Sequence, residues 1–131
     1  MKNAKRAPLI IAHAENIPAK VMENPDFLKA FREALGQRTG IYALYKDDSV
    51  FYVGLARSLR GRIADHTKNH RRHKWDRFSL FVVKKGKYLK DIESLLIRAA
   101  RPIDNQVKPD FASHHNIKKE LQREVAKVAA F

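Results

Sequence analysis

The spacing of apolar residues predicts four helices along the chain. The first covers residues 25–36, where apolar side chains recur every three or four positions. Asn24 is the expected N-cap of this helix, and Pro25 occupies its first turn. A short helix, "LRGRIADHTKNH", follows Ser58. The run "KYLKDIESLLIRAAR" forms a third helix that Pro102 stops, and "NIKKELQREVAKVAAF" forms an amphipathic fourth.

Three apolar runs between these helices predict strands. "GIYALYKDDSVFYVGLA" reads as a hairpin around a Lys-Asp-Asp-Ser turn, and "RFSLFVVKK" reads as a central or covered strand. Residues 1–24 read as a loosely structured lead-in, within which "PLIIAHA" is either a short strand or a packed extended segment. The order predicts an α/β (α+β) fold, a small sheet covered by helices without repeated βαβ winding.

The length and composition indicate a single domain with a strong positive charge. The 131 residues are 44% hydrophobic, enough for a core. Lys and Arg number 27 against 14 Asp and Glu, a net charge of +13. This excess opposes folding and favours a polyanionic partner, most simply nucleic acid. A membrane surface is the rival, weakened because no long basic amphipathic helix carries bulky aromatic residues.

Several classes of protein are excluded by features that the sequence lacks. The chain has no cysteine, which excludes disulfides and thiolate metal sites. No apolar run approaches the roughly 20 residues that span a bilayer. The apolar run near the N-terminus is too short for a signal peptide, so we expect a cytoplasmic protein.

The hairpin carries one tyrosine on each arm, and its register decides whether they meet. Because side chains alternate along a strand, Tyr42 and Tyr52 share a face only if the loop between the strands is odd in length. A regular hairpin with a two-residue turn at Asp47-Asp48 would place them on opposite faces. The sequence therefore predicts a three- or five-residue connection if the tyrosines form one site.

Three more polar residues stand beside apolar positions. Arg62 and His66 lie one helical turn apart next to a buried stripe. Glu93 is flanked by aliphatic residues on the third helix, where a carboxylate is costly unless it is paired or binds a metal. Asn105 follows Pro102 in a loop that can fold back toward the same place.

This ordered set resembles the GIY-YIG nuclease superfamily. Gly40-Ile41-Tyr42 matches the first motif, and Tyr52-Val53-Gly54 matches the second with valine in place of isoleucine. The downstream pattern continues in order with Leu59, Arg62, His66, Glu93 and Asn105. The resemblance covers residues 39–107, with an N-terminal extension over 1–38 and, over 108–131, a loop and an amphipathic helix that we expect to pack on this core.

The resemblance implies metal-dependent hydrolysis of DNA phosphodiesters by in-line attack of water, on a three-stranded, mainly antiparallel sheet flanked by helices. Arg62 would stabilise the charge that builds on the phosphate oxygens. Glu93 would bind one Mg²⁺ or Mn²⁺, an ion that keeps most of its waters. Tyr42 and Tyr52 would position the attacking water and help to deprotonate it, and Asn105 would support the site by hydrogen bonding.

The identity of the general base stays open between Tyr42 and His66. A phenol has an ordinary pKa of about 10, which nearby cations can lower, whereas an imidazole titrates near neutral pH. We favour Tyr42 with His66 assisting. A zinc site built from His66, His70 and His73 is disfavoured, because the helix breaks between them, Arg71 and Arg72 repel a cation, and no fourth ligand is evident.

Basic residues between positions 57 and 90 outnumber acidic ones by twelve to two. Such side chains can grip backbone phosphates on both sides of a cleaved bond without reading bases. The candidates for nucleic-acid binding are Arg57, Arg60, Lys68, Arg71, Arg72, Lys74, Lys84, Lys85 and Lys87.

Two other functions remain possible from the sequence. One is a catalytically silent or weak DNA- or RNA-binding module with this fold, against which the complete catalytic set argues. The other is a basic RNA-binding protein, although the aromatic signatures of common RNA modules are lacking. The flanks are too small for a separate recognition domain. We therefore expect specificity for double-stranded or branched DNA either to be low or to come from the substrate's structure, a homodimer or a protein partner.

Overall fold

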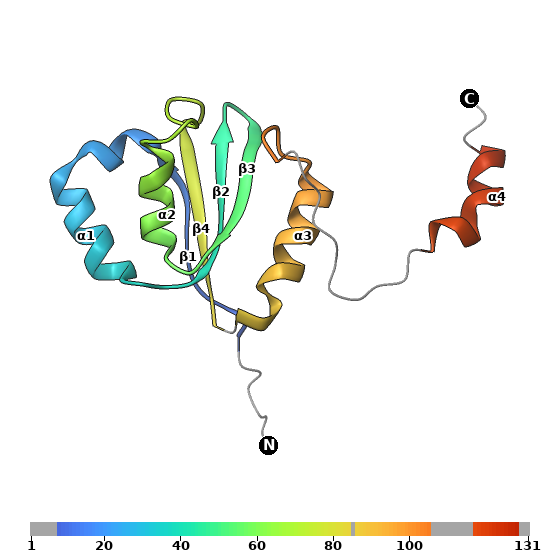
Figure 1. Ribbon diagram of the computed structural model, residues 1–131, viewed down its shortest axis with the longest axis horizontal. Coiled ribbons are helices and arrows are strands. Elements are labelled where there is room, and N and C mark those ends of the chain that lie inside the picture. The colour runs from blue at the N-terminus through green and yellow to red at the C-terminus, as the bar shows by residue number, and fades with distance from the viewer. Residues whose placement is uncertain (1–7, 85, 106–116, 129–131) are drawn as a thin grey trace, which may run out of the picture.

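The computed structural model describes residues 8–84, 86–105 and 117–128, and it places one antiparallel sheet at the centre (Figure 1). The four strands are β1 (Ile10–Pro18), β2 (Gly40–Lys46), β3 (Ser49–Ala56) and β4 (Arg77–Val83). Their order across the sheet is β1-β4-β2-β3, and every neighbouring pair is antiparallel. β3 is thus an edge strand, next to the central β2.

Helices cover both faces of this sheet (Figure 1). A 3-10 turn η1 (Ala19–Glu23) leads into α1 (Pro25–Leu35), and α2 (Leu59–His66) follows the hairpin. A second 3-10 turn η2 (Gly86–Tyr88) leads into α3 (Leu89–Ala100), and α4 (Lys118–Val128) comes last. The side chain of Asn24 caps α1 at the N–H of Phe27, as the sequence predicts.

The antiparallel sheet flanked by helices is confirmed, but it has four strands and not three. The additional strand is β1, whose pairing with β4 makes the short-strand reading of "PLIIAHA" correct and the loose lead-in wrong over residues 10–18. The sequence signal was weak because β1 has two register irregularities and exposes most of its side chains, so apolar and polar residues do not alternate cleanly.

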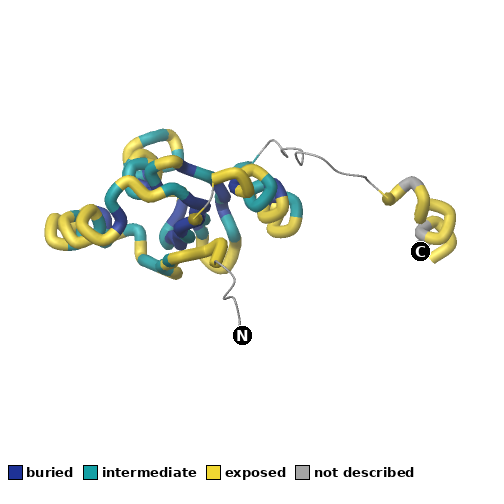
Figure 2. Tube along the Cα trace, turned by 90° about the horizontal axis from the view of Figure 1, so that it is seen from below, coloured by how far each residue is buried: buried dark blue, intermediate teal, exposed yellow. Residues whose placement is uncertain are grey.

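Buried residues gather in the strands at the centre of the fold (Figure 2), and they form two clusters. Under α1 and α2, Leu59 and Ile63 pack with Tyr42, Leu44 and Phe78. Under α3, a smaller cluster joins Leu89 and Ile97 to Ile41, Val53 and Val83. Neighbours in β2 therefore point to different clusters, and Tyr42 belongs to the cluster under α2.

The hairpin turn is shorter than the sequence analysis predicts. Only Asp47 and Asp48 separate β2 from β3, so the three- or five-residue connection is wrong. The pairing nevertheless changes along the hairpin: Tyr45 faces Val50, whereas Leu44 faces Tyr52. The skipped residue, Phe51, forms a β-bulge that restores the parity the short turn removes. Tyr42 lies opposite Gly54, so it shares a face with Tyr52 after all.

The packing of the C-terminal helix on the core stays a prediction. The described side chains of α4 are all exposed, including Ile117 just before it, Leu121 and Val128. Figure 1 draws α4 apart from the sheet. In the part of the chain that the structure describes, no helix is long and apolar enough to cross a membrane.

Gly40 marks the point where the chain enters the centre of the sheet. A Cβ at this position would overlap the backbone carbonyl oxygen of Phe81 in β4 and would also press on the side chain of Leu59. The backbone carbonyl cannot move without disturbing the ladder between β2 and β4. The glycine of the first motif thus allows β4 and α2 to approach β2.

We predict that Gly40→Ala lowers the free energy of unfolding by about 1–3 kcal/mol, the usual cost of overpacking. Gly86→Ala is the matched control, because its added Cβ would meet Leu89 at an ordinary 3.9 Å. Chemical denaturation of both variants measures the difference. Equal stabilities for the two variants would contradict the assigned role of Gly40.

Candidate active site

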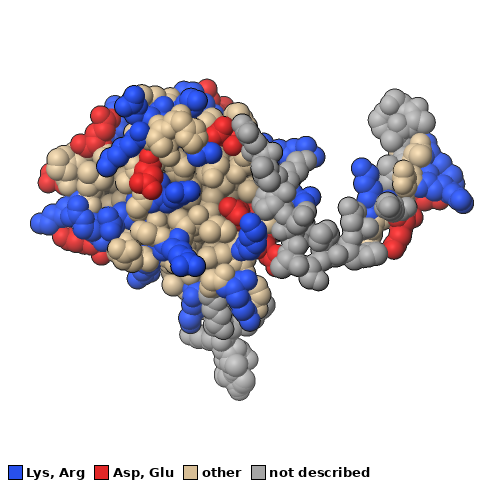
Figure 3. All heavy atoms as spheres, viewed as in Figure 1, with Lys and Arg blue, Asp and Glu red and all other residues tan. Residues whose placement is uncertain are grey.

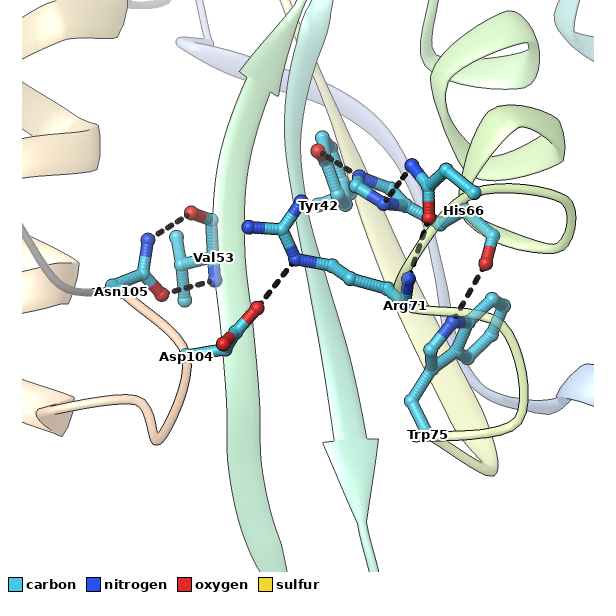
Figure 4. Close-up of polar contacts among 8 residues, drawn as sticks. Tyr42, Val53, His66, Arg71, Trp75, Asp104 and Asn105 are labelled. Atoms are coloured by element: carbon cyan, nitrogen blue, oxygen red, sulfur yellow. Dashed lines mark hydrogen bonds and ion pairs between the residues drawn. The ribbon is translucent and has the colours of Figure 1, made fainter.

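A buried hydrogen bond between Tyr42 and His66 forms the centre of the candidate site (Figure 4). The phenol oxygen of Tyr42 lies 2.7 Å from Nε2 of His66, and each residue is only 1% exposed. Tyr42 comes from the middle of β2, and His66 is the last residue of α2. Ser58 caps α2, since its side chain accepts from the N–H of Gly61, and the eight residues that follow end with His66 over the sheet.

Tyr52 completes an aromatic triangle with these two residues. Its ring centre lies 6.1 Å from that of Tyr42 and 5.4 Å from that of His66. Gly54 leaves room for the triangle, since a Cβ there would lie 2.5 Å from the phenol oxygen of Tyr42. The glycine of the second motif is therefore explained by the tyrosine of the first.

His66 is held from three sides. Asn69 Nδ2 lies 3.3 Å from its Nδ1, and Trp75 Nε1 donates to its backbone carbonyl at 3.2 Å. Burial lowers the pKa of His66 to about 4, with the charges of Arg71 and Arg62 acting in the same direction. The imidazole is thus neutral at physiological pH. Both ring nitrogens are occupied, which leaves no lone pair for the disfavoured zinc site.

The surroundings of Tyr42 shift its pKa in opposite directions. Burial, with Tyr52 as a second cause, raises its pKa above the ordinary value. The positive charge of Arg62, a hydrogen bond from Arg62 and the charge of Arg71 each pull the pKa down. The protein alone therefore keeps the phenol protonated, and additional positive charge at the site would favour the phenolate.

Arg71 extends over the triangle and is anchored on the far side of β3. Its guanidinium carbon lies 3.9 Å from the ring centre of Tyr52, and its Nε is 2.7 Å from a carboxylate oxygen of Asp104. Both side chains are mostly buried, so the pair is better ordered than a typical surface ion pair. The remaining guanidinium nitrogens can still contact an anion.

Asn105 fastens the segment that carries Asp104 to the edge of the sheet (Figure 4). Its Oδ1 accepts from Val53 N at 2.8 Å, and its Nδ2 donates to Val53 O at 2.9 Å. The N–H groups of Ile103 and Asp104 donate to Val50 O and Phe51 O. Residues 103–105 therefore satisfy the open edge of β3 beside the bulge.

Arg62 borders an open cleft on the same side as Tyr42. About half of its side chain is exposed, and its nearest carboxylate is Asp65 at 4.0 Å. The cleft has a volume of about 380 Å³ and is lined by residues 55–58, Gly61, Arg62 and Asp65. Arg62 is thus free to meet an anion from solvent while it influences Tyr42.

Glu93 lies on α3, which packs on the opposite face of the sheet from α2. Its carboxylate is mostly buried and lies 3.9 Å from Lys90 Nζ, a long contact with an exposed lysine. Among the described residues, no group of three or more His, Asp or Glu side chains could hold a metal ion. A single partly buried carboxylate fits a hydrated Mg²⁺ or Mn²⁺, which needs one or two protein ligands.

The predicted nucleic-acid contacts divide into two groups. Those with exposed side chains are Arg57, Lys68, Arg72, Lys74, Lys84 and Lys87. Arg60 is partly buried and donates to Gly36 O, and Arg71 is held by Asp104. Lys85 lies outside the described residues. Figure 3 shows basic side chains spread over the visible face with acidic groups between them.

Sequence reasoning missed Asn69 and Asp104, and it gave Arg71 only a general role. Asp104 is adjacent to Asn105, so its position pointed to the site, but the ion pair joins segments 33 residues apart. Asn69 is three residues after His66. The sequence predicts a helix through residue 70, but α2 ends at His66, so Asn69 reaches the imidazole from the following loop. The relation of Glu93 to the tyrosines stays a prediction, as do the catalytic roles of the six motif residues.

Comparison with known proteins agrees with this architecture. The family model of the GIY-YIG catalytic domain matches residues 38–107, so the chain belongs to the GIY-YIG family. No curated protein matches the chain.

Two crystal structures of the GIY-YIG N-terminal endonuclease domain of UvrC from Thermotoga maritima have the same fold. Their identities are 22% and 21%, the match covers 60% of this chain and 97% of each domain, and both TM-scores are 0.50. Both are point mutants with phenylalanine in place of a tyrosine, bound to the catalytic divalent cation of that enzyme.

We predict that the buried His66 makes stability depend on pH. Its folded-state pKa of about 4 lies below the ordinary 6.5, so between these values the unfolded chain binds more protons. Stability therefore falls as pH drops from 6.5 to 4, by roughly 3 kcal/mol if each pKa unit is worth about 1.4 kcal/mol.

Denaturation at several pH values, with His66→Gln as the reference, measures this contribution. The wild-type protein should lose more stability than His66→Gln across this window. Parallel stability profiles for the two proteins would show that His66 is not held neutral by burial.

Proposed function

We propose that the protein is a metal-dependent DNA endonuclease that hydrolyses phosphodiester bonds by in-line attack of water. The observation that carries the proposal is the buried Tyr42–His66 hydrogen bond with Arg62 and Arg71 beside it. Arg62 also lines an open cleft. Membership of the GIY-YIG family supports it. The UvrC domains, described as endonuclease domains bound to a divalent cation, support metal use.

In this mechanism Tyr42 is the general base. Its phenol first loses its proton to solvent, and the phenolate oxygen then takes a proton from the attacking water as the new O–P bond forms. The bond to the leaving oxygen breaks in the same displacement. His66 stays neutral and supports the phenolate by a hydrogen bond, and Tyr52 restricts where the water can lie.

Positive charge stabilises the phosphate in the transition state. Arg62 reaches the cleft from α2, and Arg71 lies over Tyr52 with part of its guanidinium unpaired by Asp104. Guanidinium groups suit this role because they donate two parallel hydrogen bonds to phosphate oxygens. Arg71 therefore acts beside the reacting group and not only on the outer DNA backbone.

Glu93 is the proposed ligand of one Mg²⁺ or Mn²⁺. A bound divalent cation neutralises phosphate charge and stabilises a leaving oxygen. Its charge would also add to the effect of the arginines in lowering the pKa of Tyr42. Asn105 supports the site indirectly, by fixing the segment that holds Asp104 and hence Arg71.

The proposed substrate is double-stranded or branched DNA, gripped at its phosphates by the exposed lysines and arginines. Specificity would come from substrate structure, a homodimer or a protein partner, and the proposed location is the cytoplasm. One observation favours the second candidate, a silent nucleic-acid-binding module: burial holds the phenol of Tyr42 protonated, which disfavours base catalysis.

Incubation of supercoiled plasmid with the protein and Mg²⁺ or Mn²⁺ tests the proposal. We predict metal-dependent nicking or linearisation, and a loss of at least about 100-fold in Arg62→Ala and Glu93→Gln, the scale of losing a charged catalytic group. Lys29→Ala and Glu33→Gln on α1 are matched controls that should cleave at the wild-type rate. Tight DNA binding without cleavage would favour the silent module, and cleavage that persists in both site variants would refute the assigned site.

A further inference from the structure

The amide of Asn69 has one defined orientation. The backbone N–H of Arg71 lies 2.8 Å from Asn69 Oδ1, and a backbone N–H can only donate. The oxygen of the amide must therefore face Arg71. The NH₂ group then faces Nδ1 of His66 at 3.3 Å. The loop after α2 thus uses its own backbone to aim a hydrogen-bond donor at the buried imidazole.

That donor decides which nitrogen of His66 carries the proton. An NH₂ group has no acceptor capacity, so Nδ1 must offer its lone pair. A neutral imidazole has one N–H, and it is then on Nε2, the atom 2.7 Å from the phenol oxygen of Tyr42. The hydrogen bond accordingly runs from His66 to Tyr42. With this direction, His66 cannot accept the phenolic proton.

We propose that Asn69 is a positioning residue that fixes His66 in the Nε2–H tautomer and thereby assigns the role of base to Tyr42. The inference rests on the proposed nuclease function for its catalytic meaning. The phenolic hydrogen of Tyr42 must point away from His66, and a phenolate would receive the Nε2–H hydrogen bond. Asn69 thus acts on the reaction through two other side chains and touches no reacting atom.

The surroundings of the pair support this chain of hydrogen bonds. The charged and titratable groups that influence the two rings are Tyr52 from β3, Arg62 and Asp65 from α2, and His70 and Arg71 from the following loop. The two arginines disfavour an imidazolium, consistent with a pKa of about 4 for His66. The ring therefore remains neutral over the range in which its tautomer matters.

Asn69→Asp is the sharpest test, because it keeps an oxygen for the N–H of Arg71 and replaces only the donor. The new carboxylate accepts from Nδ1, so the proton of His66 moves to Nδ1 or the ring becomes an imidazolium. Nitrogen-15 NMR of the imidazole distinguishes these states. We predict Nε2–H in the wild type and a protonated Nδ1 in Asn69→Asp. Plasmid cleavage in the variant should fall at least about tenfold, with a changed pH profile, as part of the roughly 10²- to 10⁴-fold that acid–base catalysis contributes.

His70→Asp is the matched control for charge, since it places a carboxylate on the next, exposed residue. It should keep the Nε2–H tautomer. An Nδ1–H tautomer in the wild type, or wild-type tautomer and cleavage in Asn69→Asp, would overturn the proposal. The wild-type measurement decides the matter even if the variant does not fold. Absence of cleavage by a wild-type protein that shows the Nε2–H tautomer would refute the nuclease function alone.

Discussion

The hydrogen bond between Tyr42 and His66 is the interaction on which the rest of the site depends. It joins the central strand β2 to the end of α2 inside the core, where both side chains are almost fully buried. A buried polar pair is costly unless it is satisfied, so each surrounding contact matters. Gly54 provides the space, Asn69 orients the imidazole, and Trp75 holds its backbone.

The edge strand β3 is the second feature that positions the residues of the site. The bulge at Phe51 turns Tyr52 onto the face of Tyr42, and residues 103–105 pair with the backbone of the same stretch. This pairing carries Asp104 to Arg71, whose guanidinium covers Tyr52. One short stretch of edge strand thus links segments that are far apart in sequence, and Arg71 becomes part of the site instead of a general DNA contact.

Most of the fold could be predicted from the sequence. α1 and α3 carry a clear helical period of apolar residues, α2 follows the cap Ser58, and the hairpin and β4 are apolar runs bounded by polar residues. β1 could not be predicted with certainty, since its irregular pairing leaves little alternation. The motif residues were located by their order along the chain. The predicted turn length was wrong, because the prediction assumed a regular strand ladder and a β-bulge leaves no mark in the apolar pattern. Asn69 and Asp104 were missed because contacts made by loops depend on backbone paths that periodicity does not predict.

The central claim is that Tyr42 and His66 act as one unit, and a double-mutant cycle on DNA cleavage tests it most directly. The rates of Tyr42→Phe, His66→Gln and the double variant are compared with the wild-type rate under identical metal conditions. Residues that act together show strongly non-additive losses. The account predicts that the double variant is about as slow as Tyr42→Phe alone. Losses that multiply independently would contradict it.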